Sequence, residues 1–311
     1  MNYCNTSLDY QFEFVSAMAR HGVIPVSELF FRNFGEIIRF RVTGDKPGTK
    51  NGWAILFPEG RGVFGSWKLN QSINWNAGSY KNMNRDERKK QVRELMERKK
   101  KYEDAKITRQ NAAALQCRNK WDKASVVIGS SHQYLIDKQV KAYGVRLLGD
   151  SLLVPIFDIS GDLVNIQSIN SSGIKMFHSG AAVNGNYMVI GELVGKIYIV
   201  EGYATAATIY DITNNCVVVA FNVGNLENVV KSIRGISNKF QLIIAADNDR
   251  LSLKNIGLSV AIEVSQKFNI NYVYPRFETW QVGSDFNDLT KYYSKRYIYE
   301  QLQGDLNEPA I

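Results

Sequence analysis

KIYIVEGY, at residues 196–203, and QLIIAADND, at residues 241–249, each join a short apolar run to acidic side chains. A buried strand followed by a polar turn has this pattern. From residue 196 onward such runs alternate with helix-like segments, and further strand candidates lie at 216–221 and 271–275. The alternation predicts an α/β fold with a mainly parallel, Rossmann-like sheet, in which the chemistry lies at the carboxyl ends of the strands.

Acidic residues stand at two of these strand ends. If the two strands are neighbours, Glu201, Asp247 and Asp249 converge at one edge of the sheet. Clustered carboxylates repel each other unless a divalent cation neutralises them, and oxygen ligands of this kind suit Mg²⁺ or Mn²⁺. Helix capping is the alternative explanation, but it accounts for a single acid better than for Glu-Gly and Asp-x-Asp together. Gly202 leaves room beside the expected metal.

A third acidic turn, GSDFND at residues 283–288, follows the last predicted strand. Its composition is weak evidence, because such turns are common and Asp288 is a candidate cap for a following helix. Its position after the last strand is the reason to consider it.

At these motifs the chain resembles TOPRIM-domain primases of the conjugative-plasmid and satellite-phage type. Residues 201–206, EGYATA, are similar to the EGYATG/EGYATA signature of that family, and ADND at 246–249 is similar to its Asp-x-Asp signature. The resemblance covers roughly residues 34–300 and is most specific at 130–290. It includes HQYL at 132–135, GVR at 144–146, LLVPIFDISGDLVNIQSI at 152–169 and GIKMFHSG at 173–180.

The resemblance implies roles for individual residues. It makes Glu201, Asp247 and Asp249 the catalytic acids and metal ligands, and it adds Asp285 and Asp288 to the metal site. Two divalent ions, Mg²⁺ or Mn²⁺, are the implied cofactors, and no zinc is expected. The residues implied in nucleotide or template binding are Lys175, Arg146, Gly202 and Tyr203. For Lys175 and Arg146, a solvated surface charge is an equally good explanation.

The sequence departs from related primases in two respects. Thr205 stands where bacterial replicative primases have an Asp, as in the plasmid and phage subgroup. The chain also has no cysteine-rich zinc ribbon and no GxxxxGK[ST] helicase loop. We therefore expect a primase-like core that takes template recognition or unwinding from a partner, or works without it.

Charge is distributed unevenly along the 311 residues. The chain has 38 Lys+Arg and 30 Asp+Glu, a net charge of +8 and a pI near 9.2, which points to nucleic acid as a partner. Residues 81–123 contain fifteen of the basic and seven of the acidic residues, so the net charge of this segment equals the net charge of the whole chain. The segment lacks Gly and Pro and predicts a long basic helix, unbroken or broken once. It is either a solvated connector or an arm that binds template phosphates through Lys99, Lys100 and Lys101.

The regions on either side of this helix differ in pattern. We predict a small N-terminal α+β domain at 1–80, the helical connector at 81–125, a primase-type α+β subdomain at 126–192 that opens with a helix around 131–143, and the TOPRIM domain at 193–311. Aromatic and basic residues alternate on the predicted N-terminal strands. They are either core residues or a surface on which single-stranded bases stack.

The expected location is the cytoplasm of a bacterial host. The start of the chain lacks the pattern of a secretory signal, and no apolar run is long enough for a membrane span. Three scattered cysteines, at 4, 117 and 216, predict reduced thiols and no structural zinc.

The predicted function is synthesis of short RNA primers on single-stranded DNA in plasmid or phage replication. The expected partners are the single-stranded template and nucleoside triphosphates, with a separate replicative helicase as a further candidate and no membrane. Two alternatives stay open. One is a metal-dependent TOPRIM nuclease, and the other is a non-catalytic accessory protein that binds single strands.

Overall fold

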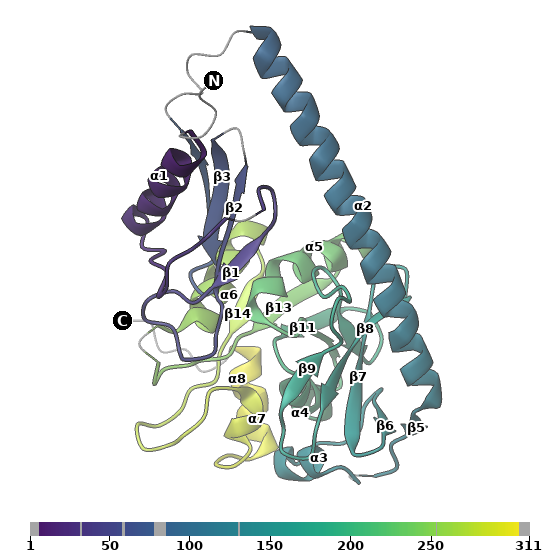
Figure 1. Ribbon diagram of the computed structural model, residues 1–311. Coiled ribbons are helices and arrows are strands. Elements are labelled where there is room, and N and C mark those ends of the chain that lie inside the picture. Colours follow the sequence, from purple (N-terminus) through teal and green to yellow (C-terminus); the bar gives the residue numbers. More distant parts are fainter. Residues whose placement is uncertain are drawn as a thin grey trace. The chain divides into compact units, whose positions relative to one another are not determined.

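The computed structural model (Figure 1) describes residues 6–31, 33–57, 60–77, 85–129, 131–252 and 254–304. The chain divides into two compact units, Met1–Lys100 and Lys101–Ile311. This division is coarser than the four parts predicted from the sequence, whose boundaries stay predictions.

The first unit is an antiparallel sheet with one helix. Its elements are α1 (Thr6–Arg20), β1 (Ile38–Phe40), β2 (Gly52–Phe57), β3 (Arg61–Ser66) and β4 (Gln71–Asn76), and the strands pair in sequence order. Phe14 and Met18 of α1 pack with Phe40, Leu56 and Phe64 of the sheet in one buried cluster. One face of the sheet therefore forms the core of this unit.

Helix α2 (Arg85–Lys123) is the predicted basic helix, and Figure 1 shows it as one continuous element. The break allowed by the sequence does not occur, which agrees with the absence of Gly and Pro. Its last turns belong to the second unit, where Cys117 packs with Leu153 and Ile166. The Arg118 guanidinium also donates a hydrogen bond of 3.0 Å to the carbonyl oxygen of Leu163.

An antiparallel sheet follows α2 in the second unit. It consists of β5 (Ser125–Val126), β6 (Arg146–Leu148), β7 (Ser151–Phe157), β8 (Leu163–Ile169) and β9 (Lys175–Phe177), paired in that order, with α3 (Gln133–Lys138) between β5 and β6. Residues of β7 alternate between two cores: Leu153 faces α2, whereas Leu152 and Val154 join the core of the next sheet. β7 and β8 form an antiparallel hairpin, with Leu152 opposite Ile169 and Phe157 opposite Leu163.

The remaining elements form the predicted α/β layer. They are β10 (Met188–Ile190), β11 (Lys196–Val200), α4 (Tyr203–Thr213), β12 (Cys216–Val219), the 3₁₀ turn η2 (Val223–Asn225), α5 (Leu226–Ile236), β13 (Gln241–Ala245), α6 (Ile256–Phe268), β14 (Asn271–Val273), α7 (Phe286–Leu289) and α8 (Lys295–Gln303). The strand order is β10-β12-β11-β13-β14, with β10 antiparallel and the others parallel.

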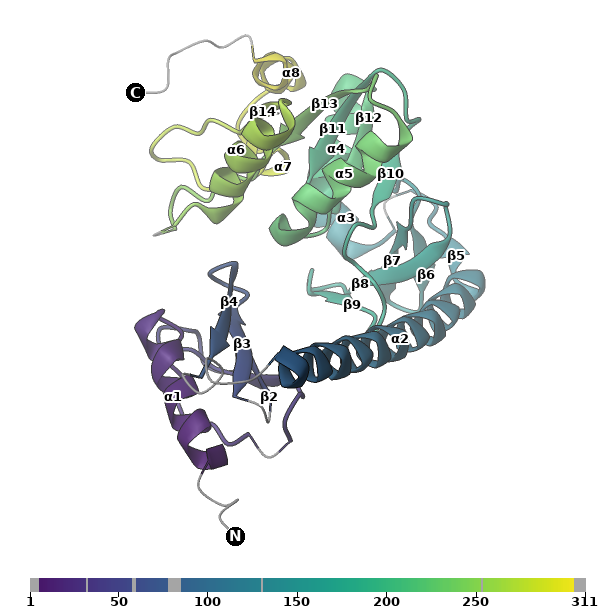
Figure 2. The same cartoon turned by 90° about the horizontal axis from the view of Figure 1, so that it is seen from above.

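Both faces of this sheet are covered by helices (Figure 2). Tyr198 and Val200 of β11 pack in the cluster that includes α4 and α8, whereas Ile197 and Ile199 pack in the cluster that includes α5 and α6. A strand buried on both faces consists of consecutive apolar residues, which is why the sequence predicted β11 as a buried strand. The predicted fold class, an α/β layer with a mainly parallel sheet preceded by α+β parts and a basic helix, is confirmed.

None of the helices in the described part of the chain has the length and apolar character that a membrane span needs. Cys117 and Cys216 are buried free thiols. Cys4 lies outside the described residues.

Candidate active site

The two motifs that opened the sequence lie at adjacent strand ends. β11 and β13 are parallel hydrogen-bonded neighbours, in register from Lys196–Gln241 to Ile199–Ile244. Glu201 and Asp247 therefore leave the same edge of the sheet, one after each strand. The condition on which the sequence prediction depended, that the two strands are neighbours, holds.

The charges of these acids act on one another. Burial raises the pKa of Glu201, and the negative charges of Asp249 and Asp285 raise it further. Burial also raises the pKa of Asp247, which with the charges of Glu201, Asp285 and Asp249 reaches about 8. The cluster of Glu201, Asp247, Asp249 and Asp285, called the acid cluster from here on, therefore carries unfavourable repulsion in its fully ionised form.

The donor set of the acid cluster fits a divalent cation. Asp247 Oδ1 is buried and has no hydrogen-bond partner, and leaving such an oxygen unpaired costs free energy. Hard oxygen donors of this kind are the ligands that Mg²⁺ and Mn²⁺ prefer. Among the described residues, no three acidic, His or Cys side chains already stand in metal-binding geometry. Binding a cation therefore requires the carboxylates to turn toward one another.

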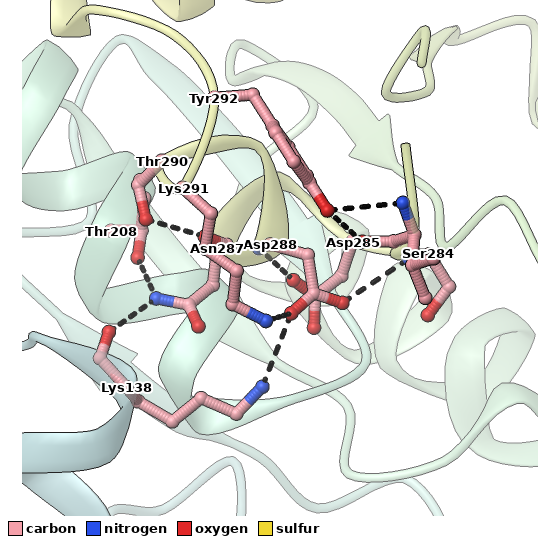
Figure 3. A network of polar contacts seen from close by, with 10 residues as sticks. Lys138, Thr208, Ser284, Asp285, Asn287, Asp288, Thr290, Lys291 and Tyr292 are labelled. Atoms are coloured by element: carbon pink, nitrogen blue, oxygen red, sulfur yellow. Dashed lines mark hydrogen bonds and ion pairs between the residues drawn. The ribbon is translucent and has the colours of Figure 1, made fainter. Parts of the chain in front are cut away.

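Asp285 and Asp288 lie in the third acidic turn, and their surroundings differ (Figure 3). Asp285 caps α7 by accepting a hydrogen bond of 2.8 Å from the backbone nitrogen of Asp288. Burial, with the charge of Asp288, raises the pKa of Asp285. The Asp288 carboxylate instead binds Lys291 at 2.8 Å and Lys138 at 3.6 Å, and the Lys291 hydrogen bond helps to hold its pKa below the ordinary value despite burial. Asp288 is therefore satisfied by protein groups, whereas Asp285 belongs to the acid cluster.

Lys175 of β9 is brought to the same place from the antiparallel sheet. Its Nζ atom lies 3.8 Å from the position that a Cβ atom at Gly202 would occupy. Desolvation of the amine and the charge of Lys138 lower the pKa of Lys175, although the residue as a whole is exposed on β9, and the attraction of the acid cluster opposes this shift. Lys175 therefore lies next to the turn that follows Glu201, within the field of the acid cluster.

Other predicted ligand-binding residues have different surroundings. The Arg146 guanidinium donates a hydrogen bond of 2.8 Å to the Trp121 carbonyl oxygen and stacks 4.6 Å from the centre of the Trp121 ring, so its described contacts join β6 to the end of α2. Tyr203 is 0% exposed, and its hydroxyl accepts a hydrogen bond from the Tyr143 backbone nitrogen. This burial leaves Tyr203 no surface for a ligand and gives it a packing role. Lys100 and Lys101 are exposed on α2, and the side chain of Lys99 lies outside the described part of the structure.

Several residues that position the acids were not singled out in the sequence. Asn248, between the two acids of the Asp-x-Asp motif, donates to the Pro275 carbonyl oxygen at 2.9 Å and accepts from the Asn255 amide at 2.7 Å. Asn255 in turn accepts a hydrogen bond of 3.0 Å from the backbone nitrogen of Asp249. The buried hydroxyl of Thr205, which the sequence marked only as a departure from bacterial replicative primases, also bonds to Asp285. The sequence offered one signal for the role of Asn248: it is an amide between two acids, and Asn side chains often stabilise turns through hydrogen bonds to the backbone.

The sheet, its strand-end acids and the order of its elements define a class of domain. Residues 196–295 match the model of the Toprim domain family. The second unit therefore contains a Toprim domain, and the resemblance stated from the EGYATA and ADND motifs is confirmed.

Curated relatives carry a more specific name. The chain is 26% identical to a DNA primase TraC of Escherichia coli over 226 residues, which are 70% of this chain and 21% of that protein. A second DNA primase TraC of Escherichia coli is 33% identical over 107 residues, which are 33% of this chain and 7% of that protein. The chain thus spans about a fifth of the first relative's length and less of the second.

Among solved structures, the primase fragment of the bacteriophage T7 primase-helicase protein matches with a TM-score of 0.41 and 13% identity. The match covers 58% of this chain and 80% of that one. This TM-score is too low to support a conclusion.

The repulsion within the acid cluster predicts the effect of removing one charge. The pKa of Asp247 rises from 3.8 to about 8 on folding, so the folded state holds an extra proton between these values and stability without metal falls as pH rises through that range. In EDTA at pH 8, Asp247→Asn should therefore raise the free energy of unfolding by about 1–2 kcal/mol. Thermal or urea unfolding measures the change.

Asp211 is the matched control. It binds Lys141 at 2.8 Å and Lys295 at 2.6 Å, and the first of these bonds is the largest influence holding its pKa below the ordinary value. Asp211→Asn should lower stability by about 1 kcal/mol at the same pH, because a lowered pKa stabilises the fold above the pKa of the unfolded chain. A destabilised Asp247→Asn protein in EDTA would contradict the account.

Proposed function

We propose that this chain is a primase-like nucleotidyltransferase that makes short RNA primers on single-stranded DNA in plasmid or phage replication. The observation that carries the proposal is the acid cluster at the ends of β11 and β13, with its buried, unpartnered Asp247 oxygen. The Toprim domain and the relatives named DNA primase support it.

Glu201, Asp247, Asp249 and Asp285 would hold one or two divalent cations, Mg²⁺ or Mn²⁺. When bound, such ions neutralise charge on the triphosphate and on the leaving pyrophosphate. Asp288 would hold the turn that carries Asp285 and stay ion-paired with Lys138 and Lys291.

A basic side chain near the acid cluster would bind the phosphates of the nucleotide. Lys175 lies beside Gly202, so its amine is placed to bind a nucleotide phosphate next to the acids. Positioning of the two reactants accounts for much of the rate in such a reaction, since the protein contributes no covalent step.

The basic helix α2 would bind the template. Lys100 and Lys101 are exposed, and Lys99 precedes them in the same helix. Phosphate contacts of this kind do not depend on sequence, which suits a template of mixed composition. A separate helicase would supply the single strand, and the bacterial cytoplasm is the compartment where these substrates meet.

Primer synthesis is the direct test of this function. The protein with single-stranded DNA, ribonucleotides and Mg²⁺ or Mn²⁺ should produce short labelled oligomers. The double variant Asp247→Asn, Asp249→Asn should lower the yield by at least about 100-fold, because it removes charge that the reaction needs. Asp211→Asn is the control and should retain activity. Primer synthesis that survives the double substitution would contradict the proposed site.

The same assay separates the alternatives. Loss of the DNA strand without nucleotide incorporation would indicate a metal-dependent nuclease. Tight binding to single strands, with no reaction and no divalent-ion binding by calorimetry, would indicate an accessory protein.

A binding experiment tests the role of α2. Replacing Lys99, Lys100 and Lys101 together by Gln should weaken binding to single-stranded DNA and reduce the slope of log K against log salt by about 2. Fluorescence anisotropy at several salt concentrations measures both. Lys231→Gln with Lys267→Gln is the control, since both of these lysines bind Glu227. An unchanged slope in the triple variant would leave α2 as a solvated connector.

A further inference from the structure

The sheet of the first unit has two unlike faces. Ala54 and Leu56 of β2 are buried in the core with α1, and a Cβ atom at Gly62 of β3 would collide with the Phe14 ring of α1. Trp53 alternates with these residues along β2 and is half-buried. Trp53 and the residues opposite it therefore occupy the face turned away from α1, called the open face from here on.

Two tryptophans and an arginine form a continuous group at this face. Trp53 lies opposite Arg39 of β1 and opposite Gly65 of β3. The ring centres of Trp53 and Trp67 are 5.8 Å apart, and the Arg39 guanidinium stacks 4.2 Å from the centre of the Trp67 ring. Trp67 nevertheless keeps 46% of its surface exposed. A large aromatic ring held by its neighbours and still exposed is a typical contact for a ligand.

Gly65 makes this arrangement possible. A Cβ atom at position 65 would lie 2.8 Å from the Trp53 ring and would overlap the Gln71 carbonyl oxygen. Because the residue is glycine, the indole ring of Trp53 has room beside β3. The next residues of the same face on β4, Ser72 and Asn74, are exposed and polar. The open face thus carries the aromatic rings of Trp53 and Trp67, with polar side chains of β4 beside them.

The charge of the open face favours an anion. The four strands contain no acidic residue, and Arg39 of β1 lies at the open face. Asp45, in the turn between β1 and β2, is 2% exposed at its side chain and binds Lys68 at 3.1 Å. Lys46 and Lys50 lie in the same turn. The ligand that fits both exposed aromatic rings and positive charge is a strand of nucleic acid with unpaired bases.

We propose that the open face of the β1–β4 sheet is a binding site for single-stranded nucleic acid. Bases stack on Trp67 and Trp53, while Arg39 binds a phosphate of the same strand. A duplex does not fit this chemistry, because its bases are already stacked. The site lies within the first unit and has no residue in common with the acid cluster, so it stands whether or not the chain makes primers.

Anisotropy of a fluorescein-labelled dT20 strand tests this proposal in the full chain, in EDTA and without nucleotides. Trp67→Ala should weaken binding by about 5-fold or more, because stacking of one base contributes at least this much. Trp67→Phe should restore most of the affinity. An abasic 20-mer should bind the wild type and Trp67→Ala equally. Phe12→Ala, which removes a 77% exposed ring of α1, is the control and should bind dT20 like the wild type.

Arg39→Gln provides a second measurement that does not depend on the tryptophan variant folding. It should reduce the salt slope for dT20 by about 1. Wild-type affinity in Trp67→Ala, together with an unchanged slope in Arg39→Gln, would overturn the proposal. An equal loss of dT20 and abasic binding in Trp67→Ala, or Trp67-dependent binding of duplex DNA, would overturn it as well. Asp247→Asn with Asp249→Asn should leave these results unchanged, which separates this site from the proposed reaction.

Discussion

Repulsion among four carboxylates at one edge of the Toprim sheet is the constraint on which the second unit depends. Glu201 and Asp247 follow hydrogen-bonded parallel strands, so the backbone ladder that stabilises the sheet also forces their charges together. Asp285 and Asp249 add to the repulsion, and one oxygen of Asp247 is buried without a partner. The raised pKa of Asp247 shows one way in which this cost is reduced, the uptake of a proton, and the cation proposed above is the other.

The residues around the acid cluster hold the acids in place and supply positive charge near them. Asn248 and Asn255 hold the turn of the Asp-x-Asp motif with hydrogen bonds to Pro275 and to the backbone of Asp249, which stabilises the main chain that carries Asp247 and Asp249. The antiparallel sheet contributes Lys175, and α3 contributes Lys138, which pairs with Asp288. The four acids therefore come from the Toprim layer, and Lys175 and Lys138 come from the part of the chain that precedes it, whereas Lys291, the second partner of Asp288, belongs to the Toprim layer itself.

The sequence predicted the features that depend on local pattern. Strands buried on both faces could be recognised as apolar runs. The acids at their ends could be recognised because the sequence changes there from apolar to charged residues. Features that depend on contacts between residues far apart in the sequence were not predicted. The helix expected around 131–143 ends at Lys138, because Gln139 adopts a left-handed conformation and the Lys138 carbonyl oxygen accepts a hydrogen bond from Asn287. Tyr203 is buried by Tyr143 and its neighbours, and the two roles considered for the N-terminal aromatics divide between residues: Phe64 is core, whereas Trp67 is exposed.

Binding of Mn²⁺ tests the central claim most directly, because it needs neither template nor nucleotide. Electron paramagnetic resonance of free Mn²⁺ in a titration with the full chain should show saturable binding. Glu201→Gln with Asp247→Asn should abolish it, and Asp211→Asn, which removes an acid already bound to two lysines, should not. Absence of saturable Mn²⁺ binding by the wild-type chain, or equal binding by the Glu201→Gln, Asp247→Asn variant, would contradict the account.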